Sequence, residues 1–305
     1  MTDVTAGASR VRDLAAHAEQ LPLLPAVVMR VLALDPRNDR YFDDLVALAE
    51  EDPTFTVRLL RVANAPMSAP TKPIVTVRQA VVRIGARECA GLVTSVAVSR
   101  VFIPRTSAQR NLWVHALQVA VAARTIAALS LAGRVHPGQA YLAGLLHDIG
   151  RFVMFESAAE DLSRVDETHW VTPEELLHSE RVLLGYDHVK LGLLVCRRWS
   201  LPEGVAEVVA HHHDYGLAGF EPQVASAELI RAVQMADFLS VRMMSVPDLA
   251  DRDPEDVAQD LDRTCVRREW PQPPVSPSVL AQRVAAIRDE ALALADSLLG
   301  PHPAE

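Results

Sequence analysis

Apolar residues recur three and four positions apart through most of this chain, which is the spacing of one face of an α-helix. Residues 41–50 illustrate the pattern, since one face collects Phe42, Leu45, Val46 and Ala49. Few stretches alternate apolar and polar residues with the period of a β-strand. The pattern therefore predicts an all-α fold.

Caps and helix breakers divide this pattern into separate helices. Asp52 is an expected N-cap before Pro53, and Thr172 with Glu175 forms a capping box. Runs rich in Pro or Gly at residues 65–73, 133–137 and 216–222 are predicted loops. The predicted helices cover residues 10–19, 25–34, 41–50, 53–64, 77–84, 86–102, 111–131, 138–148, 152–163, 173–184, 188–199, 202–213, 224–244 and 278–299.

A polar, proline-containing run at residues 103–110 separates two apolar parts of the chain. We therefore expect an N-terminal helical subdomain over residues 1–108 and a second helical subdomain over residues 109–245. Residues 246–277 are rich in Asp, Arg and Pro. The last part, residues 246–305, is expected to be a linker that holds one short helix at most, followed by a C-terminal helix.

Composition narrows the class of protein. The 305 residues include 30 Lys and Arg against 39 Asp and Glu, a net charge of −9. Phosphate neutralisation over a broad nucleic-acid surface is not expected from this balance. The three cysteines form no Cys-x-x-Cys motif, which favours a reducing compartment. No apolar run is expected to span a membrane, and the predicted location is the cytoplasm.

One dipeptide is the first indication of a functional site. His147 and Asp148 end an apolar helical run, where a buried carboxylate is costly unless it is paired or binds a metal. Asp237 is likewise embedded among apolar residues. Other candidate partners are His115, His188, His212 and His213.

Each histidine alone has an ordinary structural explanation. A core histidine such as His115 commonly binds a backbone carbonyl, His188 lies at a helix start, and His211–His213 suit the dipole at a helix end. Together, imidazoles and carboxylates on five predicted helices indicate one shared polar centre. This mixture of ligands suits Mn, Fe, Zn or Ni.

The order of these residues resembles the HD superfamily of metal-dependent phosphohydrolases. Further motifs resemble the HDOD (HD-related output domain) family of bacterial signalling proteins, over roughly residues 15–245. These motifs are Leu21-Pro22-Leu23-Leu24-Pro25, Asp52-Pro53, Arg58 to Asn64, Val77-Arg78-Gln79-Ala80-Val81, Trp113-Val114-His115, Leu142 to Gly150, Leu183 to His188, Trp199-Ser200-Leu201-Pro202 and His212-His213-Asp214.

The resemblance implies an HD-like helical core with an N-terminal HDOD subdomain. It also implies two groups of metal ligands. The first group is His115, His147, Asp148 and Asp237, and the second adds His188, His212 and His213. His212-His213 is preferred to His211-His212 because Asp214 then occupies the acidic place after the pair.

The chain departs from the related HD-GYP phosphodiesterases at three places. Asn111 stands where those enzymes carry Glu, so the resemblance does not extend to a third metal. Arg151 replaces their Lys and keeps a charge that can bind phosphate. The Gly-Tyr-Pro loop is absent, so cleavage of cyclic di-GMP is not supported.

Three functions are compatible with these residues. The sequence favours a regulatory HDOD protein with one or two metal ions, which acts by binding a nucleotide ligand or signalling proteins. The alternative is a metal-dependent phosphohydrolase or phosphodiesterase, in which Asp148 and Arg151 are the catalytic candidates. In the third interpretation the polar residues only pair with one another in the core.

Overall fold

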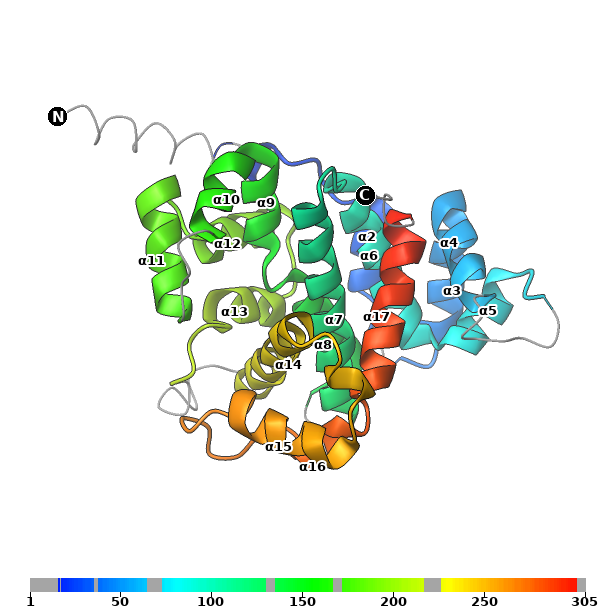
Figure 1. The fold of residues 1–305 in the computed structure, drawn as a ribbon. Coiled ribbons are helices and arrows are strands. Elements are labelled where there is room, and N and C mark those ends of the chain that lie inside the picture. The colour runs from blue at the N-terminus through cyan, green and yellow to red at the C-terminus, as the bar shows by residue number, and fades with distance from the viewer. Residues whose placement is uncertain are drawn as a thin grey trace. The chain divides into compact units, whose positions relative to one another are not determined.

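The computed structural model describes residues 16 and 18–300, apart from residues 36–37, 65–72, 130–134, 167–171 and 217–225. The predicted loop at 65–73 and most of the predicted helix at 10–19 fall outside these residues, as do parts of the loops at 133–137 and 216–222. The described residues form helices and connecting segments without a β-strand (Figure 1). This confirms the predicted all-α fold.

The chain divides into two compact units. One unit combines residues 24–104 with residues 289–305, and it contains five complete helices among its described residues. These are α2 (Ala26–Leu32), α3 (Tyr41–Glu51), α4 (Pro53–Ala63), α5 (Val77–Ile84) and α6 (Ala86–Val101). Its core buries Val28, Leu45, Phe55 and Leu59, the apolar faces of α2, α3 and α4.

The other unit combines residues 1–23 with residues 105–288. Its complete helices are α7 (Ser107–Leu129), α8 (Pro137–Leu146), α9 (Ile149–Ser157), α10 (Ala159–Asp166), α11 (Pro173–Leu184), α12 (His188–Arg198), α13 (Glu203–His211), α14 (Ala227–Ser245), α15 (Pro254–Thr264) and α16 (Pro277–Ala281), with the short 3₁₀ helix η3 (Leu249–Asp251). The last helix, α17 (Val284–Leu299), begins in this unit and ends in the other.

Helix α7 organises the larger unit. It packs most extensively against α8 and α14, while α12 packs on α9 and α13. By length and composition α7 could cross a membrane, contrary to the expectation that no apolar run is long enough. However, 72% of its most apolar stretch is buried inside the protein, as in the core helix of a globular unit.

Several of the predicted helix starts follow from side-chain caps. The Asp52 carboxylate accepts a hydrogen bond from the Thr54 N–H, and Thr172 and Glu175 form the predicted capping box. Gly185 ends α11 with φ of 78°, a left-handed conformation that favours glycine. These predictions are confirmed.

Several element boundaries differ from the predicted ones. Helix α7 begins at Ser107, four residues early, because Thr106 and Gln109 cap it reciprocally. The helix expected at 152–163 is two helices, α9 and α10, and the one expected at 278–299 is α16 followed by α17. Within the expected linker, α15 buries Val257 and Leu261.

Candidate metal centre

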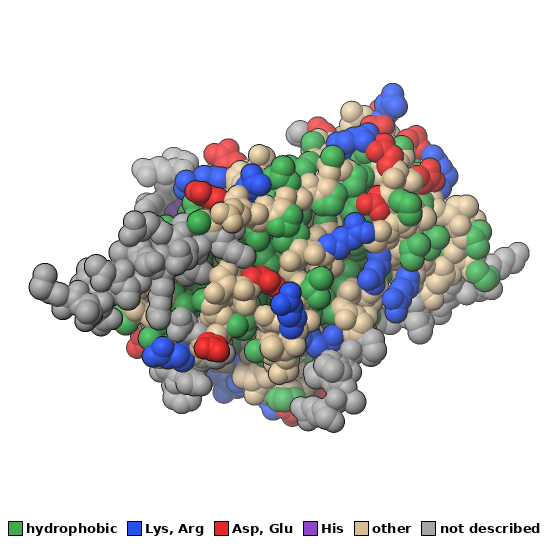
Figure 2. Space-filling view, turned by 90° about the horizontal axis from the view of Figure 1, so that it is seen from above, with side chains coloured by type: hydrophobic (Ala, Val, Ile, Leu, Met, Phe, Trp, Pro, Cys, Tyr) green, Lys and Arg blue, Asp and Glu red, His purple; other side chains and the backbone are tan. Residues whose placement is uncertain are grey.

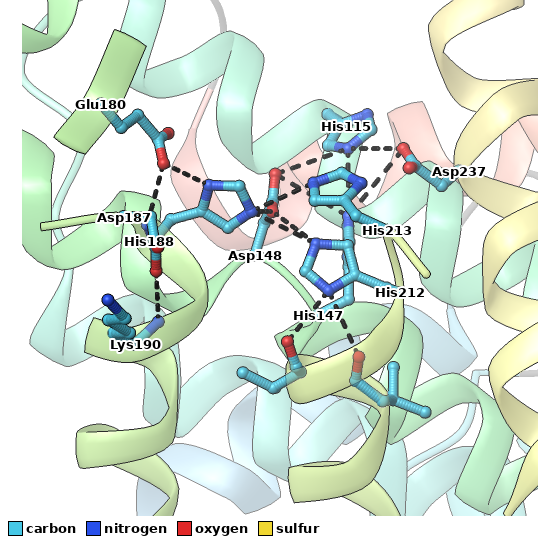
Figure 3. Close-up of polar contacts among 12 residues, drawn as sticks. His115, His147, Asp148, Glu180, Asp187, His188, Lys190, His212, His213 and Asp237 are labelled. Carbon is cyan, nitrogen blue, oxygen red and sulfur yellow. Dashed lines mark hydrogen bonds and ion pairs between the residues drawn. The ribbon is translucent and has the colours of Figure 1, made fainter. Parts of the chain in front are cut away.

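The structure brings the predicted ligands together from five places in the larger unit (Figure 3). His115 comes from α7, and Asp237 comes from α14. His147 and Asp148 join α8 to α9, His188 is the first residue of α12, and His212 and His213 follow α13. Figure 3 shows Asp148 between His188 on one side and His115 on the other.

The first group, here named the His115 subsite, consists of His115, His147, Asp148 and Asp237. Nε2 of His115 lies 3.3 Å from Nε2 of His147 and 3.3 Å from Oδ1 of Asp237. Oδ2 of Asp148 lies 3.8 Å from Nε2 of His147 and 4.0 Å from Nε2 of His115. All four side chains therefore direct a ligand atom toward one region.

The second group, here named the His188 subsite, consists of Asp148, His188, His212 and His213. Oδ1 of Asp148 lies 3.3 Å from Nε2 of His188 and 3.4 Å from Nε2 of His212. Nε2 of His188 is also 3.3 Å from Nε2 of His212 and 3.1 Å from Nε2 of His213. Asp148 thus presents a different oxygen atom to each subsite.

Contacts on the far side of the rings determine which nitrogen carries the proton. Nδ1 of His147 lies 2.8 Å from the Gly144 carbonyl, and Nδ1 of His212 lies 3.2 and 3.1 Å from the carbonyls of Val208 and Val209. A carbonyl only accepts hydrogen bonds, so Nδ1 is the donor in both rings. In a neutral ring, Nε2 is then free to bind a metal.

Nδ1 also carries the proton in His115 and His188. The Ser240 hydroxyl donates to Oε1 of Gln118 at 2.8 Å, so it accepts from Nδ1 of His115 at 2.9 Å. Nδ1 of His188 donates to the Glu180 carboxylate at 2.7 Å. Four imidazoles consequently turn an unprotonated Nε2 toward the Asp148 carboxylate when they are neutral.

This arrangement fits a cation better than it fits internal hydrogen bonding. Two neutral rings that meet through unprotonated Nε2 atoms cannot hydrogen-bond to each other, as at His115–His147 and at His188–His212. Oδ1 of Asp148 is buried and accepts no hydrogen bond of good geometry. Bonds of about 2.1 Å to one ion place neighbouring ligands about 3.0–3.4 Å apart, close to the observed separations.

The electrostatics also suit metal binding. Burial lowers the pKa of His147 to about 4, and burial together with His212 and His188 places the pKa of His213 well below its usual value. Burial alone would raise the pKa of Asp148, but His147 and His188 outweigh it and hold that pKa well below its usual range. The pKa of His188 is raised instead, because Glu180 and Asp148 outweigh its burial. Neutral His147 and His213 and ionised Asp148 are the forms that bind divalent ions.

Glu180 is a site residue that sequence reasoning missed. Its Oε2 accepts hydrogen bonds from both the backbone N–H and Nδ1 of His188, at 2.9 and 2.7 Å. Burial disfavours its charge, but His188 and Arg151 outweigh burial and lower its pKa. The sequence did hold a signal, because Glu180 lies four residues from both Leu176 and Leu184 on the buried face of α11.

Two further residues bear on the predicted site. His211 lies outside both subsites and makes a long ion pair with Asp214 at 3.9 Å, in line with the preference for His212-His213. Arg151 lies near Glu180 and His188, since its charge acts on the pKa of both groups. Its predicted role toward phosphate stays a prediction.

Comparison with known proteins identifies the family of this chain. The HDOD domain family matches residues 21–215, more than half of the chain. The chain therefore belongs to the HDOD family, as its motifs indicated. A Treponema pallidum protein, named only as uncharacterized, is 25% identical over 216 residues, which are 70% of this chain but 41% of that protein.

Solved structures share the fold. An HDOD domain protein of unknown function from Geobacter sulfurreducens has a TM-score of 0.69 and 24% identity, and the match covers 97% of this chain and 99% of the other. A presumed phosphohydrolase from Shewanella amazonensis has a TM-score of 0.69 and 21% identity, covering 93% and 97%. A presumed signal transduction protein from Marinobacter aquaeolei has a TM-score of 0.68 and 19% identity, covering 96% and 66%.

Proposed function

We propose that this HDOD protein binds two divalent transition-metal ions and hydrolyses a phosphoester. The single observation that carries the proposal is the position of Asp148. Its Oδ1 lies 3.3 and 3.4 Å from Nε2 of His188 and His212, and its Oδ2 lies 3.8 and 4.0 Å from Nε2 of His147 and His115. A shared carboxylate between two ligand sets is the arrangement expected of a dinuclear centre, whereas a purely structural cluster needs only one pairing for each group.

Each residue has a distinct role in such a centre. Two divalent ions held by these residues would supply Lewis acidity toward a phosphate and would activate water at neutral pH. Asp148 would be a ligand in both subsites, and the Nδ1 contacts of His147 and His212 fix the orientation in which each ring presents Nε2. Arg151 is the proposed cation for a phosphoryl oxygen, because a guanidinium can bind phosphate through two hydrogen bonds.

Each subsite keeps a partly accessible ligand position. The side chains of His115 and Asp237 are each 12% exposed in the His115 subsite, and His213 is partly exposed in the His188 subsite, while His188 and His212 are fully buried. Little histidine surface is visible on the face shown in Figure 2. In this proposal a substrate approaches beside one of these partly exposed side chains, because a catalytic metal needs an open position.

The types of ligand atom narrow the choice of metal ion. Five imidazoles and two carboxylates suit Fe, Mn, Zn or Ni better than Mg or Ca, which prefer oxygen ligands alone. The His188 subsite is richer in nitrogen and the His115 subsite is richer in oxygen. The two subsites are therefore expected to differ in their preferred ion.

A second candidate is a regulatory module that uses the metal centre for stability or for ligand binding. Membership of the HDOD family favours it, and one structural neighbour is named as a presumed signal transduction protein. In this proposal the partners are signalling proteins or a nucleotide, and the setting is the cytoplasm. Metal binding is common to both candidates, and turnover separates them.

The deciding experiment combines metal content with hydrolysis. Full-length protein is purified without chelator or affinity tag, beside Asp148→Asn, which keeps the side-chain volume. Elemental mass spectrometry measures Mn, Fe, Ni and Zn, and circular dichroism verifies the helical fold. The reloaded proteins are then tested on bis(p-nitrophenyl) phosphate and p-nitrophenyl phosphate.

About two equivalents of metal in the wild type, with hydrolysis that Asp148→Asn lowers at least about 100-fold, would support the enzyme. Two equivalents without turnover on either ester would favour the regulatory module. An absence of metal after incubation with all four ions would exclude both candidates and leave the residues as internal pairs.

A further inference from the structure

Glu180 forms a contact with the centre that no other described residue reproduces. Its side chain is fully buried on α11, between Leu176 and Leu184. Oε2 holds both the backbone N–H and the ring Nδ1 of His188. One carboxylate oxygen therefore fixes the first residue of α12 and the orientation of its ring at the same time.

Neutral groups hold the other rings whose Nδ1 contacts are described. Backbone carbonyls hold His147 and His212, and a serine hydroxyl holds His115. A carboxylate partner draws the Nδ1 proton more strongly than these acceptors do, and so makes Nε2 a better donor to a metal. Among these four rings, His188 is the one expected to have the highest ligand strength.

A purely structural role explains Glu180 poorly. A fully buried carboxylate is costly to desolvate, and a glutamine of the same shape could accept a hydrogen bond from His188 at lower cost. Its second oxygen, Oε1, is buried and accepts no hydrogen bond in the described structure. Both hydrogen bonds described for the carboxylate therefore go to His188, and Arg151 is the other charged group that acts on it.

The backbone around His188 is also held by close helix packing, in addition to its N–H bond to Glu180. A Cβ added to Gly150 on α9 would lie 1.8 Å from the carbonyl oxygen of His188, so α9 and α12 approach each other closely at this point. Main-chain packing therefore contributes to the position of His188. The hydrogen bond from its Nδ1 to Glu180 acts on the rotation and the basicity of the ring.

We propose that Glu180 is a positioning residue that sets the metal affinity of the His188 subsite and leaves that of the His115 subsite unchanged. This inference rests on the proposed metal centre. Loss of a carboxylate that supports a metal-bound histidine typically lowers metal affinity by about 10- to 100-fold. Without Glu180 the two subsites therefore become unequal, and one ion is lost before the other.

The test uses metal-stripped full-length protein titrated with Co²⁺, followed by visible absorbance and by calorimetry. Glu180→Gln keeps the volume and an acceptor oxygen but removes the charge. Ser240→Ala is the matched variant, because it removes the neutral Nδ1 partner of His115 in the other subsite. Thermal unfolding in the presence of a chelator measures the stability of each variant without metal.

We expect two Co²⁺ equivalents in the wild type. In Glu180→Gln one of them should bind about 10- to 100-fold more weakly, and Glu180→Asp should restore less than the wild-type affinity. Ser240→Ala should weaken the other equivalent, and by a smaller factor. Two equivalents of unchanged affinity in Glu180→Gln would overturn the inference, whereas no binding in the wild type would overturn the metal centre itself.

A measurement on the wild type covers the case in which Glu180 variants do not fold. Long-range ¹H–¹⁵N spectra of the Zn²⁺-loaded protein report which nitrogen of each ring carries a proton. His188, assigned with a His188→Gln variant, should carry it on Nδ1 with a proton resonance shifted strongly downfield. A proton on Nε2 of His188 would contradict the proposed role of Glu180.

Discussion

His211, His212 and His213 are consecutive in the chain but differ in their surroundings. His212 is fully buried in the His188 subsite, and His213 joins it there. The His211 side chain is 37% exposed and has only a distant partner, Asp214. Three adjacent histidines therefore provide ligand and non-ligand positions within one turn.

This contrast gives a matched pair of variants. His213→Ala should lower the bound metal from about two equivalents to about one, because Nε2 of His213 is 3.1 Å from Nε2 of His188. His211→Ala should leave the metal content unchanged. Elemental mass spectrometry on both variants measures the difference, and equal losses in the two would contradict the assignment of His213 as a ligand.

The three thiols give a prediction about pH. Burial raises the pKa of Cys89, Cys196 and Cys265 to about 12 in each case, so almost no thiolate forms between pH 7 and pH 9. Iodoacetamide should therefore label the native protein at least about 100-fold more slowly than the urea-unfolded protein over this range. Intact mass spectrometry counts the labels, and rapid labelling of a native thiol at pH 8 would contradict the burial.

The sequence identified the clustered histidines and aspartates better than it identified the groups that orient them. A histidine or aspartate within an apolar helical run stands out, as His115 and Asp237 did. Glu180 did not, because its helix also carries exposed acidic residues such as Glu174. The orientation of the rings depends on backbone carbonyls such as Gly144, and every residue has one, so no residue type marks them.

At the scale of helices, Gly150 determines how closely α9 approaches α12. An alanine there would place Cβ within 1.8 Å of the His188 carbonyl oxygen and 2.8 Å of the Gly192 nitrogen. Both are backbone atoms, so the helices must separate. Gly150→Ala should therefore lower the free energy of unfolding by about 1–3 kcal/mol and weaken metal binding at the His188 subsite.

Gly216→Ala is the control for that variant. The nearest atom to its added Cβ would be Oδ1 of Asp214 at 3.6 Å, an ordinary contact. Urea unfolding and a Co²⁺ titration of both variants make the comparison. If Gly150→Ala unfolds at the wild-type urea concentration and binds two ions as tightly, the close approach of the helices does not position His188.

The predicted start of a helix agrees with the structure where the sequence contains a strong capping residue. Asp52 before Pro53 and Thr172 with Glu175 are strong local signals, and both hold in the structure. The start of α7 was missed because the cap formed by Thr106 and Gln109 lies in a polar run that reads as a loop. Local sequence does not show whether such a run continues into a buried helix.

At the scale of the whole chain, the family match ends before the fold does. HDOD similarity covers residues 21–215, but the larger unit extends to residue 288. Helix α15 lies in residues 246–277, which the sequence predicts as a linker with one short helix at most, because Asp, Arg and Pro are frequent there. Its contribution depends on tertiary contacts, such as the two hydrogen bonds of 2.7 and 2.8 Å between Arg242 on α14 and Asp260.

The segment after residue 245 also reaches the neighbourhood of the metal ligands. The guanidinium carbon of Arg267 lies 4.5 Å from the ring centre of Tyr215 and 5.3 Å from that of Phe238. Tyr215 follows His213 by two residues, and Phe238 directly follows Asp237. We infer that the C-terminal segment stabilises both the fold and the positions of these two ligands.

A chain that stops after Ser245 tests this inference. It lacks the buried side chains of Leu261, Trp270 and Leu280, each worth about 1.5–3 kcal/mol when fully buried. We expect a melting temperature at least about 10 °C lower, and weaker Co²⁺ binding, because one kcal/mol shifts the melting temperature of a domain this large by about 2–4 °C. Calorimetry and absorbance measure the two effects.

Two control variants show which part of the C-terminal segment is responsible for the lower stability and the weaker metal binding. A chain that stops after Gly300 keeps α17 whole and should match the full-length protein in both measurements. Arg267→Ala removes the guanidinium over the two rings but keeps α15 and α16, so it should weaken Co²⁺ binding with a smaller loss of stability. If the chain ending at Ser245 melts and binds metal like the full-length protein, the C-terminal segment contributes nothing to the centre, and the residues that matter end with α14.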